Sequence, residues 1–159
     1  DLIGLYEHGH RDMAKLETEA QRVLSAVGLI PDTSERGSEF FEREWQILKN
    51  KKPSDLSGGM RKRVGVARAL VGEPMYVFYD EPTTGLDPVT SEQIDDLIGN
   101  LAQKLRVPSL VITHAMFSVF RIANRVAMLV AGKVRFNSTP EGLRSSSDES
   151  VKEFLERYD

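Results

Sequence analysis

Two short apolar runs constrain the fold of this chain more than any other feature of its sequence. The run from Tyr76 to Tyr79 has no polar interruption and ends in Asp80 and Glu81, and the stretch PSLVITH forms a second run that ends in His114. A run without alternation is typical of a strand buried on both faces, as in a parallel sheet. We therefore expect two buried strands whose ends carry polar side chains.

Helical patterns separate and flank the two runs. Asp87 followed by Pro88 predicts the start of one helix, whose buried stripe would be Ile94, Leu97, Ile98, Leu101 and Leu105. Further helices are expected after Asp12, around 40–48, over 116–123 and around 151–155, with a hairpin that turns at 131–133. Strands that alternate with helices and end in polar residues indicate an α/β layered domain.

The stretch LSGGMRKRVGVARAL places Gly58 and Gly59 at the start of a predicted helix. Glycine costs roughly 1 kcal/mol in a helix interior relative to alanine, so two glycines here need a reason. Ser57 is a good N-cap, and exposed amides at a helix N-terminus attract anions. Without side chains, the two glycines would let a phosphate approach the backbone. Taken alone, the same pattern also fits an ordinary capped turn.

Two acids and a histidine follow the predicted strands. Asp80 can hold Mg²⁺ through water, because Mg²⁺ keeps much of its hydration shell. Glu81 can orient or deprotonate an attacking water. His114 ends the second strand and should lie on the same rim, where it could sense a terminal phosphate. The alternatives are exposed acids at a strand end, a structural histidine and, for Asp87, a plain N-cap.

These stretches, taken in order, resemble a known family. LSGGM, YVFYDEP, GLDP and VITH resemble the signature motif, Walker B, D-loop and H-loop of ABC-type ATPases. The resemblance implies an α/β P-loop NTPase core, incomplete here, with an α-helical subdomain. It places the helical subdomain with the signature motif in residues 1–71 and the C-terminal part of the ATPase core in residues 72–159.

The resemblance also implies roles and partners. ATP bound to the opposite subunit of a homodimer would be contacted by Ser57, Gly58, Gly59 and Met60. Asp80 would support Mg²⁺, Glu81 would polarise water, His114 would contact the γ-phosphate and Asp87 would communicate across the dimer. An integral membrane permease would be the further partner, which places the chain peripherally on the cytoplasmic face of the inner membrane.

Two details narrow the resemblance. Met60 stands where Gln is more usual, and the tail STPEGLRSSSDESVKEFLERYD ends in a short helix after a polar loop. Both features resemble the ATPases of phospholipid-trafficking importers, which work with mammalian-cell-entry (MCE) domain proteins in the bacterial envelope. This reading predicts a lipid cargo and an MCE-domain partner.

The sequence also departs from the family pattern. No stretch matches G-x-x-x-x-G-K-[ST], and AGKV at 131–134 lacks both the upstream glycine and the hydroxyl. The expected Gln-bearing loop is missing, and Ala115 follows His114 where Asp is common. We therefore expect the C-terminal part of a longer ATPase that alone neither binds ATP tightly nor hydrolyses it. The segment 31–52 is longer than expected, and the sequence leaves its role open.

Composition bears on the alternatives. A formal net charge of −3 and a pI of about 5.7 argue against nucleic-acid binding. They also disfavour a soluble ABC ATPase of DNA maintenance. A non-catalytic permease-binding module is a third reading, against which Glu81 and His114 speak. The chain has no cysteine, and no apolar run approaches the roughly 20 residues that span a bilayer.

Overall fold

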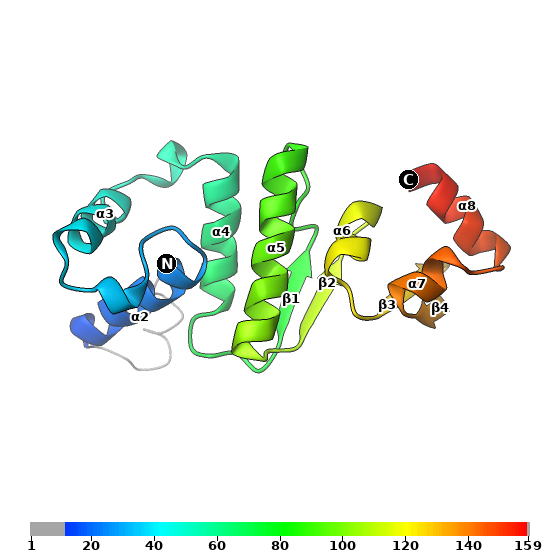
Figure 1. Cartoon of the computed structure of the whole chain (residues 1–159), viewed down its shortest axis with the longest axis horizontal. Helices are drawn as coiled ribbons and strands as arrows, with labels where there is room; N and C mark the ends of the chain where they lie inside the picture. The colour runs from blue at the N-terminus through cyan, green and yellow to red at the C-terminus, as the bar shows by residue number, and fades with distance from the viewer. Residues whose placement is uncertain (1–11, 159) are drawn as a thin grey trace. The chain divides into compact units, whose positions relative to one another are not determined.

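The computed structural model describes residues 12–158, which form two compact units (Figure 1). The first unit comprises residues 12–78 and 83–110, and the second comprises residues 79–82 and 111–158. The first eleven residues of the expected helical subdomain lie outside the described residues. The subdomain boundary between residues 71 and 72 stays a prediction.

The predicted helices and the hairpin are all present. The helices of the first unit are α2 (Met13–Ala26), α3 (Glu39–Lys49), α4 (Gly58–Ala69) and α5 (Pro88–Leu105), with 3-10 turns at Thr33–Glu35 and Pro53–Asp55. Strands β1 (Val77–Asp80) and β2 (Ser109–Ile112) run from the first unit into the second. The second unit adds α6 (Met116–Ile122), β3 (Val126–Val130), β4 (Lys133–Ser138), α7 (Pro140–Arg144) and α8 (Glu149–Tyr158).

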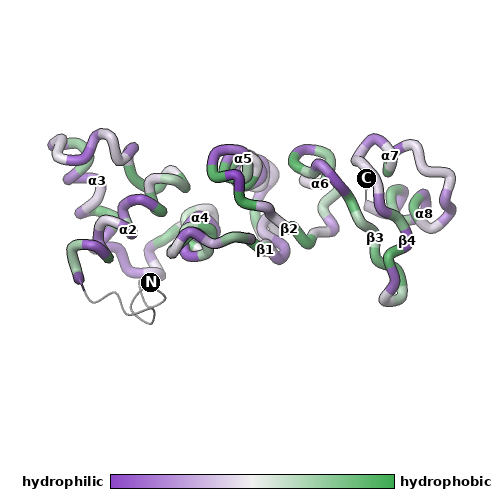
Figure 2. The backbone as a smooth tube through the Cα atoms, turned by 90° about the horizontal axis from the view of Figure 1, so that it is seen from below, coloured by the Kyte–Doolittle hydropathy of each residue, from purple (hydrophilic) through white to green (hydrophobic). Residues whose placement is uncertain are grey.

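Helix α3 gives the segment 31–52 its role, because this helix packs against α2. Phe41 and Trp45 are buried in one cluster with Ala20 and Ile30. Trp45 Nε1 donates a hydrogen bond to Glu17 Oε1 at 2.9 Å, and Lys49 Nζ donates to the same oxygen at 2.8 Å. The bonds from Lys49 and Trp45 lower the pKa of Glu17. In Figure 2 hydrophilic and hydrophobic residues alternate along α2 and α3, as expected of helices that bury one face.

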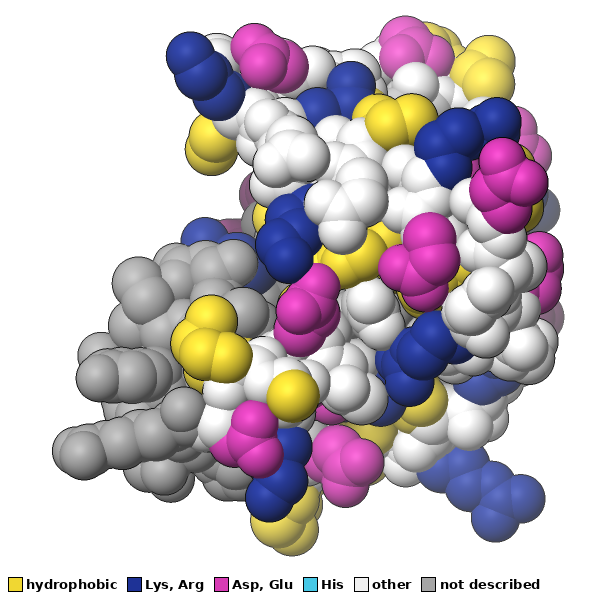
Figure 3. All heavy atoms as spheres, turned by 90° about the vertical axis from the view of Figure 1, so that its left-hand side faces the viewer, with side chains coloured by type: hydrophobic (Ala, Val, Ile, Leu, Met, Phe, Trp, Pro, Cys, Tyr) yellow, Lys and Arg dark blue, Asp and Glu magenta, His cyan; other side chains and the backbone are white. Residues whose placement is uncertain are grey.

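The outer surface of these helices mixes both signs of charge. Figure 3 shows basic and acidic side chains interspersed on the face that carries α2 and α3. Pairs such as Lys49–Glu17 at 2.8 Å and Arg43–Glu44 at 3.2 Å contribute to this pattern. A mixed surface of this kind differs from the clustered basic stripe of a nucleic-acid-binding face.

Helix α4 is held against α2 by side chains that reach backbone groups. Arg22 Nη2 donates to the carbonyl of Leu70 at 3.1 Å, just after α4 ends. Arg63 Nη1 donates to the carbonyl of Val27 at 2.6 Å, just after α2 ends. Each bond places a guanidinium group on a carbonyl at the C-terminus of a helix, which is α4 for Leu70 and α2 for Val27. A cation at this end of a helix stabilises the helix. Helix α4 is therefore tied to α2 both near its middle, at Arg63, and just after its end, at Leu70.

Strands β1 and β2 pair in parallel, as the sequence predicts. The amide of Val77 donates to the carbonyl of Pro108 at 3.1 Å, and the amide of Glu81 donates to that of Ile112 at 2.9 Å. The same offset at both positions means that the two strands run in the same direction. The carboxyl ends of both strands therefore lie at the same edge of the sheet.

The expectation that both strands are buried on two faces is wrong. In β1, Val77 and Tyr79 are buried but Phe78 is 70% exposed, and in β2 Leu110 and Ile112 are more than half exposed. Within residues 12–158 only these two strands pair in this sheet. Alternation of buried and exposed side chains is the pattern of a sheet covered on one face.

Three residues of the predicted stripe of α5 are buried, whereas Leu97 is half-buried and Leu105 is exposed. Ile94, Ile98 and Leu101 are at most 4% exposed, whereas Leu105 is 39% exposed. Leu105 is the last residue of α5, and Arg106 then takes a left-handed conformation that ends the helix. The last turn of α5 therefore leaves the Leu105 side chain partly exposed, and the buried stripe ends at Leu101.

The second unit has its own core beneath α6 and α8. Met116, Val119, Leu143 and Val151 are buried together, and Phe154 packs against them. The hairpin turns at Ala131 and Gly132, which both have positive φ, as a two-residue type I′ turn requires. The apolar spacing of the sequence did not predict helix α7, although Thr139 before Pro140 is a good cap signal. Among residues 12–158, no helix is long and apolar enough to span a membrane.

The α2–α3 cluster predicts a large difference between two neighbouring phenylalanines. Phe41→Ala should lower the free energy of unfolding by about 3–5 kcal/mol, because it empties a fully buried site. The matched control, Phe40→Ala, removes a ring that is 51% exposed and should change little. The fluorescence of Trp45, the only tryptophan of the chain, reports unfolding in denaturant. Equal losses in the two variants would contradict this packing.

Candidate functional site

Ser57 caps α4, as the sequence predicts. Its Oγ accepts a hydrogen bond from the amide of Met60 at 3.2 Å. The amides of Gly58 and Gly59 have no acceptor within the helix, because the first turn of any α-helix leaves its donors unpaired by that helix. The start of α4 therefore carries backbone donors and the positive end of the helix dipole.

The glycine pair has a packing reason that the sequence did not reveal. A Cβ atom on Gly59 would lie 2.9 Å from Thr90 Cγ2, and one on Gly58 would lie 3.4 Å from Leu86 Cδ2. The first distance is too short for two carbon atoms. Gly59 therefore lets the start of α5 approach the start of α4.

Asp87 is the N-cap of α5, as predicted. Its carboxylate accepts hydrogen bonds from the Thr90 hydroxyl at 2.5 Å and from the Thr90 amide at 3.0 Å. These bonds lower the pKa of Asp87, the hydroxyl contributing more than the amide. The stability that the charged Asp87 cap contributes is therefore fully present at pH values above the ordinary pKa of an aspartate. It is lost as the pH falls through the lowered pKa of Asp87.

The starts of α4 and α5 open on one hollow of about 400 Å³. It is lined by Ser57, Gly58, Gly59, Met60, Arg63, Gly85, Leu86, Asp87, Thr90 and Gln93. The structure thus brings together every residue of the expected ATP-contacting set, and Asp87 with them. Arg63, Thr90 and Gln93 are additions. Arg63 could have been found, because it lies four residues after Gly59 and so on the same helix face.

The hollow suits an anion with several acceptor oxygens. Two helix N-termini supply backbone donors and partial positive charge, and Ser57 and Thr90 supply hydroxyl groups. The carboxylate of Asp87 opposes an anion, but its two bonds to Thr90 direct it to its own helix. Phosphate is the ligand class that this donor set fits best.

Glu81 and His114 form a pair in the second unit. His114 Nδ1 lies 2.7 Å from Glu81 Oε1, and the two residues follow β1 and β2 respectively. The expectation that His114 shares a rim with an acid at the strand ends is confirmed. A carboxylate at this distance is an acceptor, so we assign a proton to Nδ1 of the imidazole. Both side chains remain partly exposed, at 33% for Glu81 and 60% for His114.

The backbone at Glu81 is unusual. Its φ is +46°, in the left-handed region that few residues other than glycine adopt. The amide of Glu81 donates to the carbonyl of Ile112, which holds the turn in place. Strain of this kind costs of order 1–3 kcal/mol and clusters at functional sites. Nothing in the sequence signals it, since no glycine or asparagine stands here.

Asp80 ends β1 with an exposed side chain. Within residues 12–158, no three His, Cys, Asp or Glu side chains are grouped so that they could hold a metal ion. Mg²⁺ commonly takes one or two carboxylates and completes its shell with water and phosphate oxygens. Asp80 fits such a partial site, and its metal role stays a prediction.

Comparison with known proteins gives a consistent answer. A family model described as "ABC transporter" matches residues 5–84. The methionine import ATP-binding protein MetN of Caulobacter vibrioides is 40% identical over 130 residues, covering 79% of this chain and 39% of MetN. The probable amino-acid ABC transporter ATP-binding protein y4tH of Sinorhizobium fredii is 35% identical over 149 residues, covering 92% of this chain and 57% of y4tH.

Solved structures agree with the family match. The dimeric post-hydrolysis state of the ATP-binding cassette MJ0796, bound to ADP and Pi, superposes with a TM-score of 0.59 at 29% identity. The match covers 81% of this chain and 49% of MJ0796. The chain therefore belongs to the ABC transporter family, and the predicted ABC ATPase fold is confirmed. It spans about half of the MJ0796 chain and less than two thirds of the curated relatives named here.

The contact between Gly59 and Thr90 predicts a substitution pattern. Gly59→Ala should lower the free energy of unfolding by about 1–3 kcal/mol, because its methyl group overpacks against Thr90. Gly65→Ala, on the same helix with nothing within 4 Å, should instead stabilise by about 0.4–1 kcal/mol. Adding Thr90→Ser to Gly59→Ala removes the opposing methyl group and keeps the hydroxyl, so stability should partly return. Chemical denaturation of the three variants would contradict the packing if Gly59→Ala matched Gly65→Ala.

Proposed function

We propose that this chain works as part of the ATP-hydrolysing subunit of an ABC transporter. The observation that carries the proposal is the Glu81–His114 pair, 2.7 Å apart at the ends of two parallel strands. The match to the ABC transporter family supports it, and so does the ADP and phosphate bound to MJ0796. Because the sequence contains no phosphate loop, we propose that residues outside this chain supply it.

The hollow at the start of α4 is the proposed phosphate contact. Ser57, Gly58, Gly59 and Met60 would present donors to the phosphates of ATP held by a second subunit. Asp87, which lines the same hollow, would respond to that contact and pass it across the dimer. The dimeric form of MJ0796 supports a homodimer as the working state.

The hydrolytic chemistry would fall to the paired residues. A carboxylate has about four acceptor positions, so Glu81 can hold the Nδ1 proton of His114 and still accept a proton from water. With Nδ1 donating to Glu81, His114 must be protonated on both nitrogens in order to donate from Nε2 to a phosphate oxygen. Asp80 would hold Mg²⁺ through water, and the bound ion would neutralise charge on the phosphates.

The partners follow from the transporter assignment. We propose an integral membrane permease as the partner and a peripheral position at the cytoplasmic face of the inner membrane. For the cargo, the relatives MetN and y4tH, named for methionine import and amino-acid transport, favour an amino acid. They give no support to an MCE-domain partner.

Lipid cargo is the second candidate. It is favoured by Met60 at the edge of the hollow and by the tail that folds into α7 and α8. Purification of the complete protein with its permease, followed by mass spectrometry of that permease and its bound small molecules, separates the two cargoes. An amino acid that stimulates ATP hydrolysis in reconstituted vesicles supports the first candidate, and a phospholipid supports the second.

Two other functions fit less well. A soluble ATPase of DNA maintenance is disfavoured because the relatives named here are transporter components. A non-catalytic permease-binding module would have no use for a glutamate in a strained backbone that pairs with a histidine.

Hydrolysis should depend on a phosphate loop in addition to this chain. We expect the complete protein to hydrolyse ATP and the isolated 159-residue chain to show no turnover. Glu81→Gln should reduce kcat of the complete protein by about 10²–10⁴-fold, the range for loss of a general base. Glu39→Gln, the same change at an exposed position of α3, is the control. Turnover by the isolated chain, or full activity of Glu81→Gln, would count against the proposal.

A further inference from the structure

Tyr158, the last residue of α8, lies against His114. The two ring centroids are 6.0 Å apart and the rings meet at 61° in an edge-to-face arrangement. Favourable aromatic pairs have centroid separations of about 4.5–7 Å and prefer this geometry to a face-to-face stack. None of the four recognised motifs includes Tyr158.

The position of Tyr158 is set by the core of the second unit. Its ring packs on Phe154 with centroids 4.7 Å apart, and Phe154 packs against the cluster that contains Met116 and Val151. Met116 begins α6, two residues after His114. The same core therefore anchors both the helix that follows His114 and the helix that ends in Tyr158.

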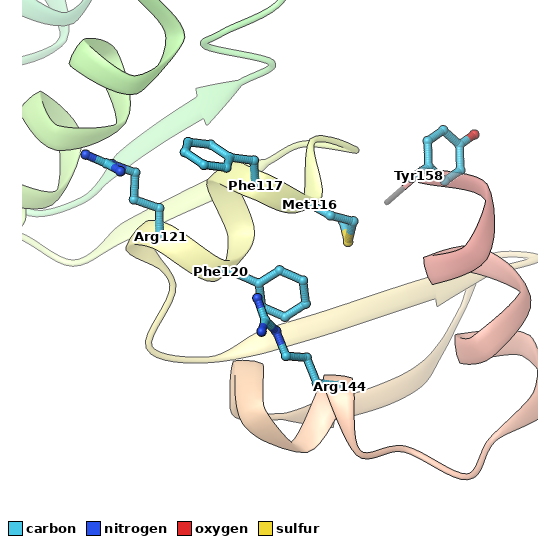
Figure 4. A pocket seen from close by; sticks show the side chains of 6 residues that line it. All are labelled: Met116, Phe117, Phe120, Arg121, Arg144 and Tyr158. Atoms are coloured by element: carbon cyan, nitrogen blue, oxygen red, sulfur yellow. The ribbon is translucent and has the colours of Figure 1, made fainter. Parts of the chain in front are cut away.

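Met116 and Tyr158 also line a hollow of about 470 Å³, which Figure 4 shows from close by. Met116 on α6 and Tyr158 on α8 lie at one end, while Phe120 and Arg144 lie at the other. The guanidinium carbon of Arg144 sits 4.0 Å from the centre of the Phe120 ring, which ties α7 to α6. Side chains of α6, α7 and α8 therefore all line the hollow that Tyr158 borders.

The imidazole is thus held at two places. Glu81 holds Nδ1 through one hydrogen bond, and the Tyr158 ring borders the imidazole through an aromatic contact. A ring held by one hydrogen bond alone can rotate about its χ2 angle, since terminal torsions of this type are broad. The second contact limits that rotation.

We propose that Tyr158 is a positioning residue that keeps Nδ1 of His114 directed at Glu81. The aromatic ring performs this task and the hydroxyl does not, so phenylalanine should replace tyrosine and leucine should not. The contact itself stands independently of ATP hydrolysis, whereas its consequence for catalysis rests on the proposed function of His114.

The test uses NMR of the 159-residue chain with ¹⁵N-labelled histidine. His114→Gln identifies the His114 signals among those of the three histidines. In the unsubstituted chain and in Tyr158→Phe, the ¹⁵N shifts should report a proton on Nδ1, and cross-peaks should join the imidazole to the aromatic ring. Tyr158→Leu should shift the signals towards a mixture of tautomers. The control is Tyr76→Leu, the same change at an exposed tyrosine of the first unit, and it should leave them unchanged.

Two results would overturn the inference. One is the absence of cross-peaks between the two rings in the unsubstituted chain, a readout that requires no variant to fold. The other is an unchanged His114 tautomer in a folded Tyr158→Leu chain.

A second measurement addresses catalysis. In the complete protein, Tyr158→Leu should lower kcat roughly two- to tenfold with KM for ATP unchanged, and Tyr158→Phe should restore it. Unchanged kcat in Tyr158→Leu would also overturn the positioning role. A complete protein with no ATP hydrolysis would overturn the proposed function instead, while the NMR result would still decide the contact.

Discussion

The close approach of α4 and α5 at Gly59 is the constraint on which the hollow at the starts of these two helices depends. Two helix N-termini side by side carry partial charges of the same sign, so their approach needs compensation. Asp87 provides it, because its carboxylate sits at the start of α5 beside the start of α4. The carboxylate of Asp87 thus stabilises the two adjacent helix ends, and its hydrogen bonds to Thr90 hold it at the start of its own helix.

The second unit follows a different design. Its candidate site residues, Glu81 and His114, follow the ends of β1 and β2, and each is held by a neighbouring contact rather than by deep burial. Glu81 is held by the bond of its amide to Ile112, and His114 by Glu81 and Tyr158. Partial exposure leaves both side chains open to water and to a ligand, while the local contacts supply the order that burial would otherwise give.

The sequence predicted most of the elements because their signals are local. Caps such as Asp12, Ser57 and Asp87, together with apolar spacing, were enough to place the helices. The exposure of Phe78 was not predictable, since burial of a strand depends on what covers its second face. The methyl contact of Thr90 with Gly59 and the aromatic contact of Tyr158 with His114 join residues far apart in sequence. No periodicity or short motif encodes such contacts.

The left-handed backbone at Glu81 has a consequence for how this position can change. Asparagine or glycine would relax the φ of +46° and so favour the folded chain. Either residue would lose the carboxylate that meets His114. Backbone stability and the contact with His114 therefore favour different amino acids at this position.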